Sequence, residues 1–174
     1  MRCLDVVGVV QEIFQVKLCR CPISGVITDE EWRDHNGLLH RRDEPAIIRR
    51  ERGSGTITER SWYWRNQLHR ADGEPAMLEY AEQSGKLVRR HWLLYGEYSR
   101  SNDLPHVEWV DEETGVVVRA EYLLKSSPGK RSLLHRENGP ALMFFDRSTG
   151  EQTEASFYRS GRKQGVPPRP ALKP

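Results

Sequence analysis

The sequence has few cysteines, no long hydrophobic run and no large excess of one charge. Its three cysteines, Cys3, Cys19 and Cys21, include no C-x-x-C pair, so we expect neither a zinc site nor a disulfide framework. We expect the cysteines to be reduced. No apolar run approaches the ~20 residues of a membrane span. The N-terminal stretch MRCLDVVGVVQEIF contains Asp5 and Gln11, where a secretory signal is uniformly apolar. We therefore expect a soluble protein in a bacterial or host-cell cytoplasm.

The charge balance argues against a general nucleic-acid-binding protein, because the formal net charge is only +2. The cations are mostly arginine, 21 against 6 lysines, and 25 acidic residues are interspersed with them. Arginine favours planar pairing with carboxylates, so the sequence predicts ion pairs within the molecule. Sustained helical periodicity is also lacking, which argues against an α-helical fold.

What the sequence does contain is a period of 30 residues, marked by aromatic, glycine and proline residues. The three series are Trp32, Trp62, Trp92 and Tyr122; Gly25, Gly55, Gly85 and Gly115; and Pro45, Pro75 and Pro105. The next members, Phe157, Gly150 and Pro140, follow after 35 residues rather than 30, which indicates one insertion of five residues. A fixed period of this length is typical of a repeat architecture.

Each period contains two stretches rich in β-branched and aromatic residues, joined by a turn that ends in glycine. Residues 46–51 (AIIRRE) and 56–64 (TITERSWYW) are one such pair, and RGSG joins them. Stretches of this kind, bounded by glycine or proline, predict strands, and a glycine permits the positive φ of a hairpin turn. The sequence therefore predicts an all-β fold, an elongated, twisted, single-layer antiparallel sheet of about five β-hairpin repeats of 30 residues.

The array divides into three expected parts. Residues 1–24 are predicted to form N-terminal capping strands, 25–155 the hairpin repeats, and 156–174 a degenerate C-terminal repeat with a proline-rich tail. Alternation along the long strands further predicts that the aromatic series shares one face of the sheet with Arg60 and Arg90.

A short segment that we call the His-Arg phrase precedes each proline of the 30-residue series. Its copies contain His40, Arg41 and Asp43; His69, Arg70 and Asp72; Arg100 and Asn102; and His135, Arg136 and Asn138. A His-Arg-Asp sequence occurs in kinase catalytic loops, but here the spacing is His-Arg-x-Asp, and copies in a row neither form one active site nor converge on a metal. Turn formation explains the phrase better, since Asp or Asn bonds nearby backbone, proline presets φ, and arginine pairs with a carboxylate in a ladder. We therefore expect no catalytic residues, no metal and no cofactor, and a protein that is not an enzyme.

The segments NGLLHRRDEPA (36–46), RNQLHRADGEPA (65–76) and RENGPA (136–141) resemble MORN-type β-hairpin repeats. They are more similar to the related L-H-R-x-[DN]-G-P-A repeats of bacterial, phage and large-virus proteins. The resemblance implies an elongated β-meander that serves as an interaction surface, without catalytic residues. The chain departs from the MORN pattern in its longer period and in having His-Arg-x-[Asp/Asn] in place of His-Gly-x-Gly.

Two places that depart from the period are the candidate partner-binding sites. They are the insertion at 125–131, with Lys125, Lys130 and Arg131, and the surroundings of the third phrase, with Tyr95, Tyr98, His106 and Trp109. Insertions in repeat proteins map to surface loops, and aromatic residues are enriched at protein-binding hot spots.

The function we expect is a non-enzymatic protein-binding module, in its most concrete form a phage-encoded inhibitor of a bacterial defence or host protein. The alternative is nucleic-acid or nucleotide binding, with Arg60 and Arg90 neutralising phosphates and Trp62 and Trp92 stacking on bases. A hydrolase hidden in the repeats is a third reading. Open sheet edges also permit a homo-oligomer.

Overall fold

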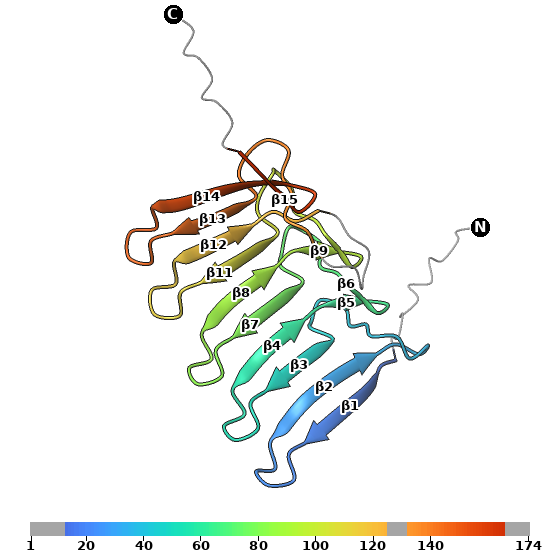
Figure 1. The fold of residues 1–174 in the computed structure, drawn as a ribbon. Helices are drawn as coiled ribbons and strands as arrows, with labels where there is room; N and C mark the ends of the chain where they lie inside the picture. The colour runs from blue at the N-terminus through green and yellow to red at the C-terminus, as the bar shows by residue number, and fades with distance from the viewer. Residues whose placement is uncertain (1–12, 125–131, 166–174) are drawn as a thin grey trace, which may run out of the picture.

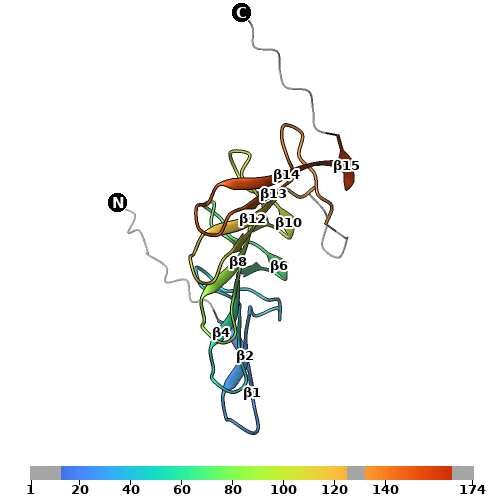
Figure 2. The same cartoon turned by 60° about the vertical axis from the view of Figure 1, so that its left-hand side comes forward.

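The computed structural model describes residues 13–124 and 132–165. In this part of the chain all regular elements are strands, and eleven of them form one antiparallel sheet in the order β1-β2-β3-β4-β7-β8-β11-β12-β13-β14-β15 (Figure 1). The strands are β1 (Gln15–Arg20), β2 (Ile27–Arg33), β3 (Ile47–Arg50), β4 (Ile57–Ser61), β5 (Tyr63–Trp64), β6 (Gln67–Leu68), β7 (Met77–Tyr80), β8 (Leu87–His91), β9 (Leu93–Leu94), β10 (Glu97–Tyr98), β11 (Val107–Val110), β12 (Val117–Glu121), β13 (Leu142–Phe145), β14 (Gln152–Arg159) and β15 (Arg162–Gln164). An oblique view shows a twisted sheet that is a single layer thick (Figure 2). The predicted all-β, elongated, single-layer fold is confirmed.

Five long hairpins make up most of this sheet, and their turns have the same geometry. The hairpins are β1–β2, β3–β4, β7–β8, β11–β12 and β13–β14. In the first turn Gly25 has a φ of 75° and donates its N–H to the Cys21 carbonyl at 2.9 Å. Gly55, Gly85, Gly115 and Gly150 have φ between 68° and 78° and make the equivalent bond. The predicted hairpin glycines are therefore confirmed, and a side chain at these positions would impose a strained backbone.

Short hairpins form a second row at the other end of the strands, opposite the long turns (Figure 1). They are β5–β6, β9–β10 and the end of β14 with β15, and single bridges, Arg33–Leu39 and Leu123–Leu134, lie at the equivalent places of the first and fourth hairpins. Neighbouring members of the row are hydrogen-bonded. The Gly96 N–H, for example, donates to the Leu68 carbonyl at 2.8 Å, and the Gly161 N–H donates to the Leu134 carbonyl at 2.9 Å.

The core is thin because a single layer has no second sheet to pack against. It lies where the long strands meet the loops that carry the His-Arg phrase. Trp62, Trp92 and Tyr122 are buried there. The alanines that follow the phrase prolines, Ala46, Ala76 and Ala141, are fully buried. A small side chain at that point lets the loop lie close against the strand.

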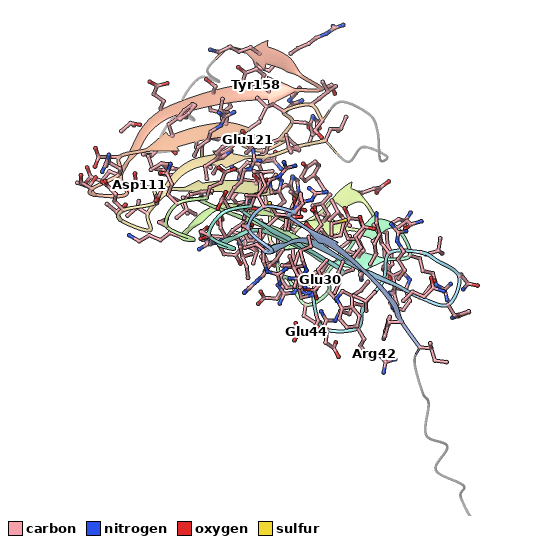
Figure 3. All side chains as sticks on the ribbon, turned by 90° about the horizontal axis from the view of Figure 1, so that it is seen from below. Glu30, Arg42, Glu44, Asp111, Glu121 and Tyr158 are labelled. Carbon is pink, nitrogen blue, oxygen red and sulfur yellow. The ribbon has the colours of Figure 1, made fainter. Side chains whose placement is uncertain are left out.

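Charged side chains pair across neighbouring strands of the layer, whose side chains are drawn in Figure 3. Arg49 lies between Asp29 and Glu59, at N–O distances of 3.7 and 2.7 Å, and Arg89 pairs with Glu79. The predicted ion pairing within the molecule is confirmed at these positions. Across the described residues the structure has no helix with the length and hydrophobicity required to cross a bilayer.

Candidate functional site

The arginine of the His-Arg phrase has a packing role in every copy. Its guanidinium lies over the aromatic ring of the preceding long strand, with Cζ-to-centroid distances of 3.8 Å for Arg41–Trp32, 4.0 Å for Arg70–Trp62, 3.5 Å for Arg100–Trp92 and 3.8 Å for Arg136–Tyr122. The same guanidiniums donate to the carbonyls of Pro45, Pro75, Pro105 and Pro140, at 3.0–3.4 Å. Cation–π contacts shielded from water contribute about 2 kcal/mol each. The arginine thus packs each phrase loop against the long strand before it, and this packing accounts for its recurrence in every copy.

The Asp or Asn of the phrase forms the bend of this loop. Asp43, Asp72 and Asn102 have φ of 61–62°, a left-handed conformation that Asp and Asn tolerate better than most residues. Asn138 differs, because the positive φ falls on the next residue, Gly139.

The first three bends also link to the following unit through a backbone carbonyl. Trp92 Nε1 donates to the Gly73 carbonyl at 2.8 Å, and the Tyr122 hydroxyl donates to the Asp103 carbonyl at 3.1 Å. The expected Arg–Asp/Asn ladder occurs at one step only, where Arg136 pairs with Asp103 of the preceding phrase loop at 2.8 Å. The phrase arginine pairs mainly with glutamates, such as Arg100 with Glu108 at 2.7 Å.

The histidines of the first two phrases belong to a row of rings along the short hairpins, which we call the aromatic ridge. Its members are Phe14, His40, Trp64, His69 and Tyr95, with successive centroid distances of 6.1, 4.6, 6.4 and 4.1 Å. Histidines from the phrase loops alternate with rings from β5 and the β9–β10 turn. The ridge therefore crosses several units, although its residues are far apart in sequence.

The ridge is exposed where its largest rings lie. Trp64 is 44% exposed and Tyr95 is 55% exposed, which is unusual for aromatic side chains. Leu94 beside Tyr95 is also exposed. A groove of about 430 Å³ runs past His40, Trp64 and His69, and polar residues of the first two phrases line its other side. An apolar centre with a polar rim is typical of protein interaction sites.

Hydrogen bonds hold the ridge in place. The Tyr95 N–H donates to His69 Nδ1 at 3.3 Å while the two rings stack. His69 must therefore be unprotonated at Nδ1, and burial lowers the pKa of this histidine. Tyr95 has a positive φ of 49°, and this turn conformation is supported by the bond from Gly96 described above. The exposed tyrosine is thus pre-positioned.

The sequence-predicted residues around the third phrase are only partly brought together. Tyr95 lies on the ridge. Tyr98 lies in a half-buried cluster, with ring-centroid distances of 6.4 Å to His106 and 6.4 Å to His91. Burial raises the pKa of Tyr98, and burial together with the Arg89 guanidinium lowers the pKa of His91. Tyr98 and His106 thus belong to a half-buried ring cluster rather than to an open patch.

Trp109 lies on β11 between Arg89 and Arg119, whose Cζ atoms are 4.2 and 5.5 Å from its ring. Its Nε1 is buried without a hydrogen-bond partner among the described residues. Trp109 is therefore a packed part of the sheet surface, separate from the ridge.

The basic insertion, Lys125, Lys130 and Arg131, lies outside the described residues. The chain leaves the described part after Leu124 and re-enters it at Ser132. The bridge between Leu123 and Leu134 sets both ends in the row of short hairpins.

The tryptophans and arginines to which the nucleic-acid alternative assigns base stacking and phosphate binding already contact other side chains of the protein. Trp62 and Trp92 are buried beneath Arg70 and Arg100, so neither ring is open to a base. Arg90 pairs with Glu108 at 3.2 Å, and Arg60 lies over Tyr80 at 5.7 Å. Within the described residues no group of three or more His, Cys, Asp or Glu side chains is arranged to hold a metal ion.

Comparison of the chain with protein-family models, with curated proteins and with solved structures finds no match.

Sequence reasoning missed Trp64 as a candidate residue. Its exposure results from the break between β4 and β5, where the chain leaves the long strand and enters a short hairpin. The one available signal was that Trp64 stands outside the 30-residue aromatic series, where the equivalent residues are Leu94 and Leu124.

Proposed function

We propose that this chain is a non-enzymatic protein-binding module whose contact surface is the aromatic ridge. The observation that carries the proposal is the pair of exposed, pre-positioned rings, Trp64 and Tyr95, on neighbouring short hairpins. Tryptophan and tyrosine are the residues most enriched at binding hot spots. Rings that are already ordered lose little conformational entropy on binding, which leaves more of their contact energy as affinity.

The paired charges of the chain support a protein partner rather than a nucleic acid. Arginines on both faces are engaged by carboxylates or rings, as shown for Arg49, Arg89 and Arg100. Few of them remain to neutralise a run of phosphates, which supplies most nucleic-acid affinity. A more specific form of the proposal, an inhibitor that covers a site on a bacterial defence or host protein, rests on the resemblance of the His-Arg phrases alone.

The test is quantitative affinity capture from candidate host lysates with three baits: the natural chain, W64A/Y95A, and the control I23A. Ile23 is an exposed apolar residue in the first long turn, at the opposite end of the strands from the ridge. A captured protein is then purified, and its affinity for each bait is measured by calorimetry. Loss of two hot-spot rings is expected to weaken binding at least about 30-fold, while I23A binds as the natural chain does.

Equal binding of one purified partner by the natural chain and W64A/Y95A contradicts the proposal. Salt-sensitive retention on RNA or DNA that requires Trp64 would replace it with the nucleic-acid alternative.

A further inference from the structure

The outer edge of β1 is the most apolar open edge of the sheet. β1 is the terminal strand, and among the described residues only β2 pairs with it. Val16 and Leu18 on this strand are 43% and 52% exposed, and Ile13 and Ile23 flank it with still greater exposure. Unpaired backbone groups beside exposed apolar side chains are a template for pairing with another strand.

The opposite end of the sheet is different. The free side of β14 begins with Gln152, Thr153 and Glu154, which are exposed and polar. Short β15, which pairs with the end of β14, consists of Arg162, Lys163 and Gln164 and is exposed throughout. Neither residues 152–154 of β14 nor β15 offer large apolar side chains to cover those of β1. The two ends are therefore poorly matched to each other.

The cations that would ordinarily protect an edge strand are engaged within the chain. Lys17 lies 3.9 Å from Glu31, and the Arg20 guanidinium donates to the Gly25 carbonyl. Charged edge residues oppose pairing through the cost of desolvating them, and an existing partner lowers that cost. Lys17 and Arg20 each already have a partner within the protein.

We propose that β1 pairs antiparallel with β1 of a second copy, forming a closed two-fold dimer centred on Leu18. In this register Leu18 lies opposite Leu18 of the second copy, Lys17 opposite its Cys19, and Val16 opposite its Arg20. No two like charges lie directly opposite, and both copies bury the same exposed apolar side chains. A two-fold interface uses the same patch twice and stops at two copies, whereas β1 on β14 would continue into a filament.

The pairing of two six-residue strands buries a small area, so the dimer is expected to be weak and dependent on concentration. The dimer does not use the exposed ridge rings, Trp64 and Tyr95, on which the proposed binding function rests.

Sedimentation velocity of the full chain over a wide concentration range tests the proposal. The natural chain is expected to change from monomer to dimer as concentration rises. L18K places two like charges directly opposite and is expected to raise the dissociation constant at least about tenfold. The control L104K adds the same charge at an exposed leucine of the third phrase loop and leaves the dimer unchanged. Circular dichroism confirms that both variants fold.

The register is tested by cross-linking. With Cys3, Cys19 and Cys21 replaced by serine, L18C is expected to form a disulfide-linked dimer on mild oxidation, because opposed residues lie within disulfide reach. L104C in the same background remains monomeric. A monomer at all concentrations, a dimer that L18K does not weaken, or species that grow beyond two copies would each overturn the proposal.

Discussion

The long turns differ in the residue four places before their glycine, and the difference predicts a stabilising substitution. In the fourth turn Asp111 Oδ1 accepts hydrogen bonds from the Glu113 and Thr114 N–H groups at 3.1 and 2.9 Å, and from the Thr114 hydroxyl at 3.0 Å. Asp146 and Glu51 accept the equivalent N–H groups in the fifth and second turns. The third turn has Ala81 at this place and therefore has no side-chain acceptor.

Ala81→Asp is expected to supply the missing acceptor. The backbone groups of these turns are exposed and bond water when no side chain is present, so the net gain is that of an exposed hydrogen bond, about 0.5–1 kcal/mol. The new carboxylate would lie between the turns of Glu51 and Asp111, whose charges oppose it (Figure 1). Salt screens this repulsion, so the gain is expected to be larger at 0.3 M than at 0.03 M ionic strength.

Thermal unfolding followed by circular dichroism measures the effect. A gain of this size is expected to raise the midpoint by about 1–4 °C for a chain of 174 residues. Asp111→Ala is the reciprocal change and lowers the midpoint by a similar amount. Ala81→Asn keeps an acceptor without the charge and separates hydrogen bonding from electrostatics. If Asp111→Ala destabilises the protein while Ala81→Asp and Ala81→Asn have no stabilising effect at either salt concentration, the equivalence of the turns is refuted.

Three further predictions concern the phrase, the histidines and one cysteine. Arg100→Ala removes the guanidinium that lies over Trp92 and pairs with the buried Glu108. The free energy of unfolding measured in urea is therefore expected to fall by about 2–4 kcal/mol. A loss below about 0.5 kcal/mol would contradict the packing role of this arginine. Burial lowers the pKa of His69 and His91 below 6.5, so the unfolded chain binds protons before the folded chain does as the pH falls. The stability of the folded protein is therefore expected to be highest above pH 6.5 and to decrease toward pH 5.5. A thermal unfolding midpoint that is unchanged from pH 7.5 to 5.5 would refute this. Hydrogen bonds from Ser24 lower the pKa of the Cys21 thiol, so mass spectrometry is expected to find Cys21 alkylated faster than Cys19 at pH 7.5, and Ser24→Ala to slow it.

The parts of the fold that local chemistry determines were predictable from the sequence. A glycine at positive φ marks a turn wherever it lies, so Gly25, Gly55 and their counterparts revealed the long hairpins and the sheet. The role of Arg70 was not predictable, because its contact with Trp62 requires the phrase loop to fold back over a strand already formed.

The candidate surface was predicted in part. Tyr95 was identified because it departs from the period, and it lies on the ridge. Tyr98 and His106 were identified for the same reason, yet they lie in a half-buried ring cluster with His91. Trp64 was missed because strand alternation assigns it to the face of Trp62, whereas the chain changes direction between the two. Alternation predicts a face only while a strand remains continuous.

The central claim is that the ridge is the surface that a protein partner contacts. The most direct measurement is site-specific photocrosslinking, with p-benzoylphenylalanine placed at Tyr95 and, as a control, at Ile23 on the first long turn. Both side chains are exposed, so both probes are accessible to any protein that approaches. One host protein is expected to be cross-linked from position 95 and not from position 23. Cross-linking of that protein from position 23 alone, or equally from both positions, would contradict it.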